Sequence, residues 1–312
     1  MEKTVYYKLQ ADKLPLVQLL NIAIINPPYV HFRRKAEEYI MYYILSGEMC
    51  LAEDGREYIL KPNDIIILDP SHEHYGTKST QCKYFYVHFY HEKMIELTDD
   101  TKNLQEFLLS NRISSLKSHD NLKYNKGSVS YPEIILPKYH HVSNSAAAVN
   151  LMDELGKMRE SHHGRLEYHS LKTSCMLMEF FICLSRDMTS GILYRDTSAT
   201  TRSTYIIYDM LNFFHNHYYE DISGSFLEEK YDCNFDYINR IFKKTTGKTI
   251  FVYLNELRIE QAKQLLSNGI YSISNVAEKT GFHDVYYFSK VFKKYAGITP
   301  GAYLKQIYSS FN

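Results

Sequence analysis

The chain has 312 residues, of which 45% are apolar and 23% are charged, and its 36 basic and 36 acidic side chains give zero formal net charge. This length suits about two domains that each bury a core, and the composition excludes collagen-like and wholly disordered chains. The N-terminus has scattered charges and no signal-peptide pattern, and no apolar run of about 18 residues is present to span a membrane. The five cysteines lack CxxC spacing. We therefore expect a cytoplasmic protein with buried, reduced thiols, no cofactor and no membrane partner.

Residues 20–92 have the pattern of a β-rich domain. Short runs rich in Ile, Val, Tyr and Phe lie at 39–45, 58–60, 65–68 and 84–89, and turn residues separate them. The pair Asp54-Gly55 is the strongest hairpin signal. Many short strands at close spacing predict a sandwich or a small barrel.

Helical spacing of apolar residues begins after the β-rich part, at 143–160 and 166–188. We expect these two helices to pack together, and two roles stay open for them: to pair with a second copy of the chain, or to cover the open side of the barrel. The Ser/Thr-rich stretch 189–204 is a predicted linker. The expected domains are 1–140, a β-barrel; 141–202, a helical dimerisation and linker segment; and 203–312, an all-α domain.

Two segments of the last third, 234–247 and 284–297, resemble each other at an offset of 50 residues. Each begins with a helix-capping residue (Asn234 or Asp284), contains Phe-Lys-Lys, and ends in Gly, which favours helix termination. A short helical pattern precedes each segment, most clearly at 272–282, where Gly281 suits a tight turn. A short helix, a turn and a capped basic helix predict a helix-turn-helix, whose second helix enters the DNA major groove.

Local charge supports a role in DNA binding, although the whole chain is neutral. Residues 237–263 contain six basic and two acidic side chains, and residues 285–312 contain four basic side chains and no acidic one. Basic surfaces around both predicted recognition helices fit a face that follows phosphates. The alternative, that each Lys-Lys pair only solvates a helix end, is weakened by the repetition at matching positions.

Residues 205–308 resemble the DNA-binding domain of AraC-type transcription regulators. The resemblance is carried by the two Phe-Lys-Lys segments, Ala262, Leu265-Leu266, Ile273, Val276-Ala277, Gly281-Phe282 and Gly297-Ile298-Thr299-Pro300. It implies two helix-turn-helix units joined by a long helix at about 250–266, with recognition helices in successive major grooves about 34 Å apart. One departure is Glu228, which stands where the family usually has a small buried residue.

The same resemblance implies contact positions on the two recognition helices. They are Asp236, Asn239, Arg240, Tyr286, Ser289 and Lys290, with Lys243, Lys293 and Lys294 expected at phosphates or in solvent. We expect Arg240 to hydrogen-bond guanine and Asn239 to read adenine.

The first 90 residues resemble the cupin-like sensor domain of such regulators, through His31, residues 42–47 and 62–64, and Val87-His88-Phe89. The resemblance implies a small effector, often a sugar, inside the barrel. The candidate effector residues are His31, Arg33, Tyr42, His74 and His88. The alternative for each histidine is a structural one near the barrel mouth, satisfied by backbone or water.

His72-Glu73-His74 resembles the HxH metal motif of cupin enzymes, and a spacing of two places both rings on one face of a strand. The full enzyme motif, with a following Glu, is absent, so we predict no metal. We predict an α+β protein that is a sequence-specific, effector-responsive transcription activator. Its expected partners are double-stranded DNA, a small effector such as a carbohydrate, a second copy of the chain, and RNA polymerase. The alternatives are a metal-dependent cupin enzyme with an appended helical domain, and a structural adaptor.

Overall fold

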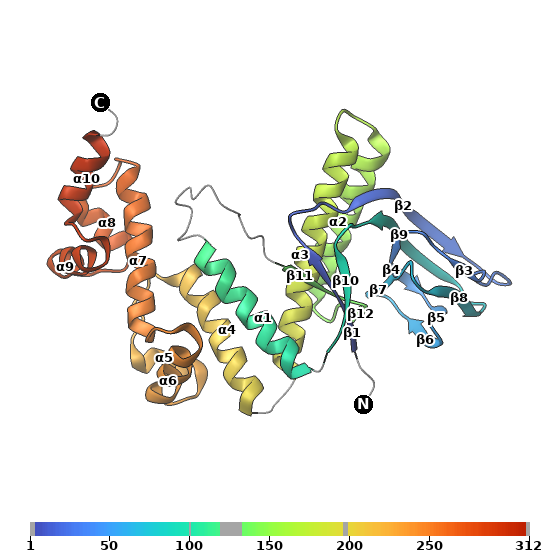
Figure 1. The fold of residues 1–312 in the computed structure, drawn as a ribbon, viewed down its shortest axis with the longest axis horizontal. Helices are drawn as coiled ribbons and strands as arrows, with labels where there is room; N and C mark the ends of the chain where they lie inside the picture. Colours follow the sequence, from blue (N-terminus) through green and yellow to red (C-terminus); the bar gives the residue numbers. More distant parts are fainter. Residues whose placement is uncertain (1–3, 100, 119–132, 196–198, 310–312) are drawn as a thin grey trace. The chain divides into compact units, whose positions relative to one another are not determined.

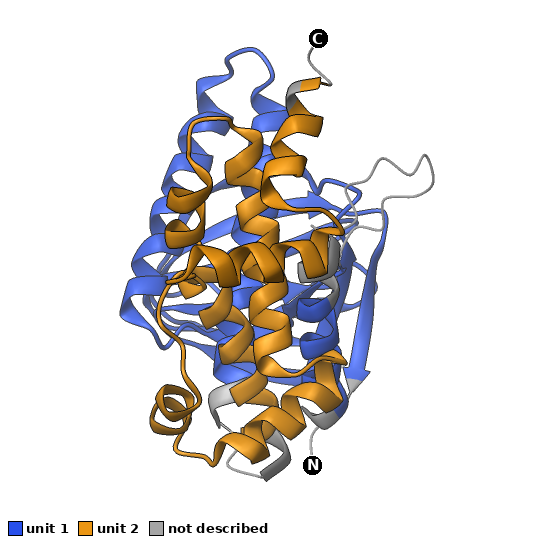
Figure 2. Cartoon of the chain, turned by 90° about the vertical axis from the view of Figure 1, so that its left-hand side faces the viewer, with its two compact units in different colours: residues 1–195 blue, residues 196–312 orange. Residues whose placement is uncertain are grey.

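The structure, a computed structural model, describes residues 4–99, 101–118, 133–195 and 199–309 in two compact units. Figure 1 shows the helices and strands, and Figure 2 distinguishes unit 1, residues 1–195, from unit 2, residues 196–312. Strands dominate the first half and helices the second, which confirms the predicted α+β class. Among the described residues, no helix combines the length and apolarity needed to cross a membrane.

The strands among the described residues of unit 1 form three antiparallel sheets rather than one closed barrel, so that part of the prediction is wrong. The five-stranded sheet has the order β12 (Tyr139–His141), β7 (Asp64–Leu68), β4 (Tyr39–Gly47), β9 (Cys82–Tyr90), β2 (Leu16–Ile25). The four-stranded sheet has the order β3 (Arg34–Lys35), β8 (Glu73–Lys78), β5 (Met49–Glu53), β6 (Arg56–Leu60). The three-stranded sheet has the order β10 (Met94–Asp99), β1 (Thr4–Gln10), β11 (Glu133–Pro137).

The five-stranded sheet is buried on both faces, which explains the unbroken apolar run of β4. Because successive side chains alternate between faces, Tyr42 and Ile44 lie in one core with residues of the four-stranded sheet. Met41 and Tyr43 lie in the other core, with the three-stranded sheet and two helices.

Those two helices are α2 (Ser145–Gly164) and α3 (His169–Arg195), while α1 (Thr101–Ser118) lies between β10 and β11 in the chain. Leu155 of α2 and Phe181 of α3 share the core with the five-stranded sheet, and the rings of Phe181 and Phe89 are 5.2 Å apart. The sequence left two roles open for these helices, and the structure shows one of them: the helices cover the β-structure.

The predicted linker 189–204 contains the boundary between the two units, at residues 195 and 196, but its described residues are helical rather than irregular. Helix α3 continues to Arg195 and α4 (Ala199–His217) begins four residues later, while residues 196–198 lie outside the described residues. The hydroxyls of Thr189 and Ser190 bond back to the carbonyl oxygens of Ser185 and Arg186, at 2.7 and 3.0 Å. Ser and Thr bonded in this way are tolerated inside a helix, so their abundance did not end α3.

The described residues of unit 2 form α4 and six further helices. They are α5 (Gly224–Tyr231), α6 (Phe235–Thr246), α7 (Ile250–Ser267), α8 (Ile273–Lys279), α9 (Val285–Ala296) and α10 (Pro300–Ser309). Helix α7 connects the α5–α6 pair with the α8–α9 pair, as the predicted long helix at about 250–266 requires (Figure 1). Phe242 of α6 packs near Phe214 of α4, and Phe288 and Phe292 of α9 share a core with α7 and α8.

Candidate nucleic-acid interface and effector site

Helices α6 and α9 have the same length and begin and end in the same way. Both have 12 residues, and the side chains of Asn234 and Asp284 cap them by accepting from the N–H groups of Asp236 and Tyr286, at 3.0 and 2.7 Å. Each ends at a glycine in the left-handed region, with φ of 81° and 80°. Capping and termination at matching positions give two basic helices of the same length, as the sequence repeat predicts.

Glu228 explains how the first helix-turn-helix departs from the family pattern. Its Oε1 accepts hydrogen bonds from the backbone N–H of Phe235 at 2.7 Å and from the side-chain amide of Asn234 at 3.3 Å. A carboxylate at a helix N-terminus also interacts favourably with the helix dipole. Glu228 therefore spans the turn and fixes the start of α6.

The second turn is held through Gly281 and Arg258. Gly281 has φ +81°, and a Cβ there would lie 2.9 Å from the carbonyl oxygen of Tyr219 and from Nη2 of Arg258. From α7, Arg258 donates to the carbonyl oxygens of Tyr218 and Glu220, both at 2.7 Å. One side chain of α7 thus ties the residues after α4 to the turn between α8 and α9.

Most of the predicted DNA contacts lie exposed on the two basic helices. The exposed ones are Asp236, Arg240, Lys243, Tyr286, Lys290 and Lys293, whereas Asn239 and Ser289 are half-buried. Among the described residues, no carboxylate forms an ion pair with the four cations of this set, whereas Lys248 and Lys263 pair with Glu256 and Glu260. The unpaired cations are available to a polyanion.

Asn239 has an internal role that the sequence analysis missed. Its side-chain oxygen accepts from the backbone N–H of Ile250 at 3.0 Å, and the cap residue of α7, Thr249, makes no side-chain cap hydrogen bond. Bidentate reading of adenine needs both the oxygen and the nitrogen of the amide, so this bond competes with it. In the second repeat the matching positions are Ser289 and Pro300, and proline has no N–H to cap.

A groove of about 260 Å³ lies beside α9, between it and α7. It is lined by Asn255, Tyr287, Lys290, Val291, Lys294 and Tyr295. Asn255 and Tyr287 were not predicted, because only the fold brings α7 beside this face of α9.

In unit 1 the structure brings four of the five predicted effector residues together: His31, Tyr42, His74 and His88. Arg34, which was not predicted, donates from Nε to Nε2 of His74 at 3.1 Å and hydrogen-bonds the hydroxyl of Tyr42. The hydroxyl of Tyr84 lies 3.3 Å from Nε2 of His31, and Nδ1 of His88 lies 2.6 Å from Glu38. We call these residues, with Tyr86, the effector cluster.

Burial controls protonation in the effector cluster. Desolvation, helped by the positive charge of Arg34, lowers the pKa values of His31 and His74 to about 4. Burial also lowers the pKa of His88, although its hydrogen bond to Glu38 acts in the opposite direction. His31 and His74 are therefore neutral at pH 7, and each offers one nitrogen as donor and one as acceptor.

Arg33 does not join the effector cluster. Its Nη1 lies 3.1 Å from Oε2 of Glu73, its guanidinium lies 3.8 Å from the ring centroid of Tyr75, and its side chain is 59% exposed. Neighbouring side chains of an extended chain point to opposite sides, so only Arg34 of the pair faces inward.

The HxH hypothesis is also not supported by the geometry. Strand β8 begins at Glu73, so His72 lies in the preceding turn, where its Nε2 is 3.9 Å from Oδ2 of Asp54. His74 bonds Arg34 instead. In the part of the chain that the structure describes, no group of three His, Cys, Asp or Glu side chains is placed to hold a metal ion.

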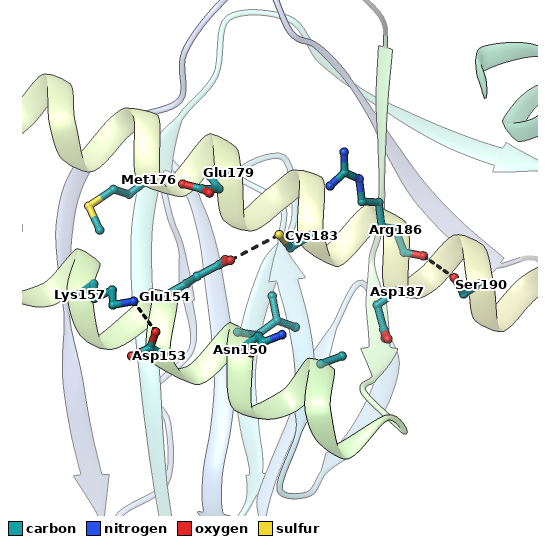
Figure 3. A pocket seen from close by; sticks show the side chains of 12 residues that line it. Asn150, Asp153, Glu154, Lys157, Met176, Glu179, Cys183, Arg186, Asp187 and Ser190 are labelled. Atoms are coloured by element: carbon teal, nitrogen blue, oxygen red, sulfur yellow. Dashed lines mark hydrogen bonds and ion pairs between the residues drawn. The ribbon is translucent and has the colours of Figure 1, made fainter. Parts of the chain in front are cut away.

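A separate groove of about 500 Å³ lies between α2 and α3 (Figure 3). Four carboxylates line it: Asp153, Glu154, Glu179 and Asp187. Sγ of Cys183 donates to Glu154 at 3.4 Å, and burial raises the pKa of that thiol to about 11, which keeps it unreactive. All five cysteines are free, but Cys175 is exposed, contrary to the expectation of burial. No predicted effector residue lines this acidic groove.

Together, the capped repeat, its unpaired cations and the separate β-rich unit define a two-unit DNA-binding regulator with tandem helix-turn-helix motifs. Residues 22–123 match the model of the AraC-like ligand binding domain, and residues 229–306 match the model of a helix-turn-helix domain. The chain belongs to the AraC family of transcription regulators.

Three relatives illustrate the range of similarity. The uncharacterized HTH-type transcriptional regulator YisR of Bacillus subtilis is 23% identical over 278 residues, or 88% of each chain. The HTH-type transcriptional activator RhaS of Mannheimia succiniciproducens is 25% identical over 201 residues, covering 64% of this chain and 70% of RhaS. The HTH-type transcriptional activator RhaR of Cronobacter sakazakii is 42% identical over 69 residues, covering 22% of this chain and 24% of RhaR.

Proposed function

We propose that the protein activates transcription in the cytoplasm by placing α6 and α9 in successive major grooves of one DNA face. The observation that carries this proposal is the pair of matched 12-residue helices whose exposed cations have no carboxylate partner among the described residues. Activation follows the relatives RhaS and RhaR, which are named activators. RNA polymerase is then a further partner.

Each proposed contact has a chemical reason. Arg240 and Lys290 donate to guanine, while Tyr286 and Ser289 lie near base edges or the backbone. Asp236 accepts from the amino group of cytosine, since an anion would otherwise repel phosphate. Lys243 and Lys293 bind phosphates and supply affinity without specificity. For Asn239 we propose that its hydrogen bond to Ile250 positions the two helices.

The effector cluster binds a small, carbohydrate-like molecule in this proposal, through His31, Tyr42, His74 and His88. Segment 141–202 mediates dimerisation in this proposal. Val149 and Met152 of α2 and Leu171 of α3 are 65%, 47% and 55% exposed, and a second copy would cover these apolar side chains. Effector binding then changes the DNA affinity of the dimer, which is a coupling between two sites.

A mobility shift with the DNA upstream of the protein's own gene tests specific binding. We expect Arg240→Ala and Lys290→Ala each to weaken binding about 10-fold or more, following a loss of 1–3 kcal/mol per bidentate contact. Lys263→Ala is the matched control, because Lys263 pairs with Glu260 on α7. Equal affinity for random and upstream DNA, with both variants behaving like the control, would contradict the proposal. The adaptor alternative predicts no affinity for either DNA and no salt-dependent binding, so that outcome would favour it.

A further inference from the structure

Arg34 is a cation without an anionic partner at the centre of the effector cluster. Among the described residues, no carboxylate lies within ion-pair distance of its guanidinium, since Glu73 pairs with Arg33 and Glu38 bonds His88. Its hydrogen-bond partners are neutral: His74 and the Tyr42 hydroxyl. A guanidinium has five N–H donors, so N–H groups of Arg34 remain for a ligand.

Two buried ring nitrogens of the cluster also lack partners. Nδ1 of His31 and Nδ1 of His74 are buried without a hydrogen-bond partner. His74 accepts from Arg34 through Nε2, so its proton resides on Nδ1, and that N–H is an unused donor. Because buried polar groups are normally satisfied, these atoms indicate a ligand rich in acceptor oxygens.

The same cluster contains tyrosine rings close to its hydrogen-bond donors. The ring centroids of Tyr42 and Tyr84 are 5.0 Å apart, and those of Tyr84 and Tyr86 are 6.3 Å apart. Tyrosine faces pack against the C–H faces of a sugar ring while hydroxyl and imidazole groups bond its oxygens. A neutral sugar would match the aromatic groups but would leave the charge of Arg34 uncompensated.

We propose that the effector is a small sugar acid whose carboxylate binds Arg34 and the Nδ1–H of His74, with its hydroxyls toward His31 and the tyrosines. This inference rests on the proposed function, which places the effector in this cluster. A guanidinium–carboxylate pair supplies a charge-assisted, bidentate contact that no hydroxyl reproduces.

The test compares acids with neutral sugars of the same ring. Thermal shift and titration calorimetry on the full chain use glucuronate and galacturonate against glucose and galactose. We expect at least one acid to raise the melting temperature while its neutral counterpart does not, because a ligand that binds only the folded state stabilises it. Arg34→Gln should weaken the binding of that acid about 10- to 100-fold, which corresponds to the loss of a hydrogen bond to a charged group.

Two further variants keep the test decisive. Arg33→Gln is the matched control and should keep the full response, since Arg33 pairs with Glu73 outside the cluster. Arg34→Lys retains the charge without the planar fork and should give partial weakening even if Arg34→Gln does not fold.

The inference is overturned if neither acid raises the melting temperature, if the neutral sugars bind equally well, or if Arg34→Gln responds like Arg33→Gln. A mobility shift with the same wild-type preparation separates the two proposals. If the chain binds its upstream DNA specifically but ignores the acids, only this inference fails. If it binds an acid through Arg34 but no DNA, the proposed function fails.

Discussion

Asn239 of α6 accepts a hydrogen bond from the backbone N–H of Ile250 at 3.0 Å and so caps α7 from a different helix. Asn239→Ala should therefore lower the free energy of unfolding of unit 2 by about 1 kcal/mol, the usual cost of a lost helix cap. Urea denaturation measures this loss. Asn239→Asp keeps an accepting oxygen and should retain most of the stability.

DNA binding by the same variant separates capping from base reading. If Asn239 acts by capping, Asn239→Ala should weaken the binding of all DNA sequences to a similar extent. Selective tolerance of substitutions at one adenine position would show instead that Asn239 reads that base.

Gly281→Ala should destabilise unit 2 more than Gly247→Ala does. Both glycines have φ +81°, but a Cβ at Gly281 would lie 2.9 Å from the Tyr219 carbonyl oxygen, whereas a Cβ at Gly247 meets nothing within 4 Å. We expect a loss of about 1 kcal/mol for Gly247→Ala from the left-handed backbone alone, and about 2–4 kcal/mol for Gly281→Ala. Equal midpoints and slopes for the two variants in urea denaturation would show that the contact between a Cβ at position 281 and the Tyr219 carbonyl oxygen is unimportant.

The stability of unit 1 should fall as pH decreases from about 6.5 to about 4. The pKa values of His31 and His74 are lowered from 6.5 to about 4 in the folded state, so in this interval the unfolded chain binds more protons. Their contribution is complete above pH 6.5 and is lost as the pH falls, by about 1 kcal/mol or more for each histidine. Urea titrations across this range should show a shallower pH slope for His74→Gln than for the wild type. An unchanged slope would mean that His74 is not held neutral by burial.

Lys138→Met should destabilise the protein by about 3–5 kcal/mol, because Lys138 and Glu53 form an ion pair in which they are only 5% and 3% exposed. The single variant leaves a buried carboxylate without its cation. The double variant Lys138→Met/Glu53→Gln should regain most of the loss, since Gln can still accept from the N–H of Asp69, now bonded to Glu53 at 2.7 Å. If the double variant is as unstable as the single one, packing rather than charge explains the loss.

The tandem helices could be predicted because their signals are local. Asn234 and Asp284 cap helices, and glycines stop them, within a few residues of sequence, so the repeat specified α6 and α9 at the correct boundaries. The long helix α7 followed from the same resemblance. The role of Asn239 was hidden, because its partner Ile250 lies in another helix.

The effector cluster was predicted less completely because it depends on strand register and chain direction. The choice of Arg33 over Arg34 required knowing which side of this extended segment points into the effector cluster. Arg34 lies opposite His74 only through the pairing of β3 with β8. Likewise, His72 and His74 share a face only if both lie in the strand, and β8 begins between them. The helix within residues 189–204 was missed for another reason. The abundance of Ser and Thr does not show whether their hydroxyls bond to carbonyl oxygens of the same helix, as those of Thr189 and Ser190 do.

Because residue 300 is a proline, position 289 in the second helix-turn-helix can be substituted with fewer consequences than position 239 in the first. Because Pro300 has no amide hydrogen to satisfy, Ser289 has no cap to supply, and substitution there leaves the following helix intact. Changes of operator preference during evolution should accumulate more readily at position 289 than at position 239, where each new side chain must also preserve the start of α7.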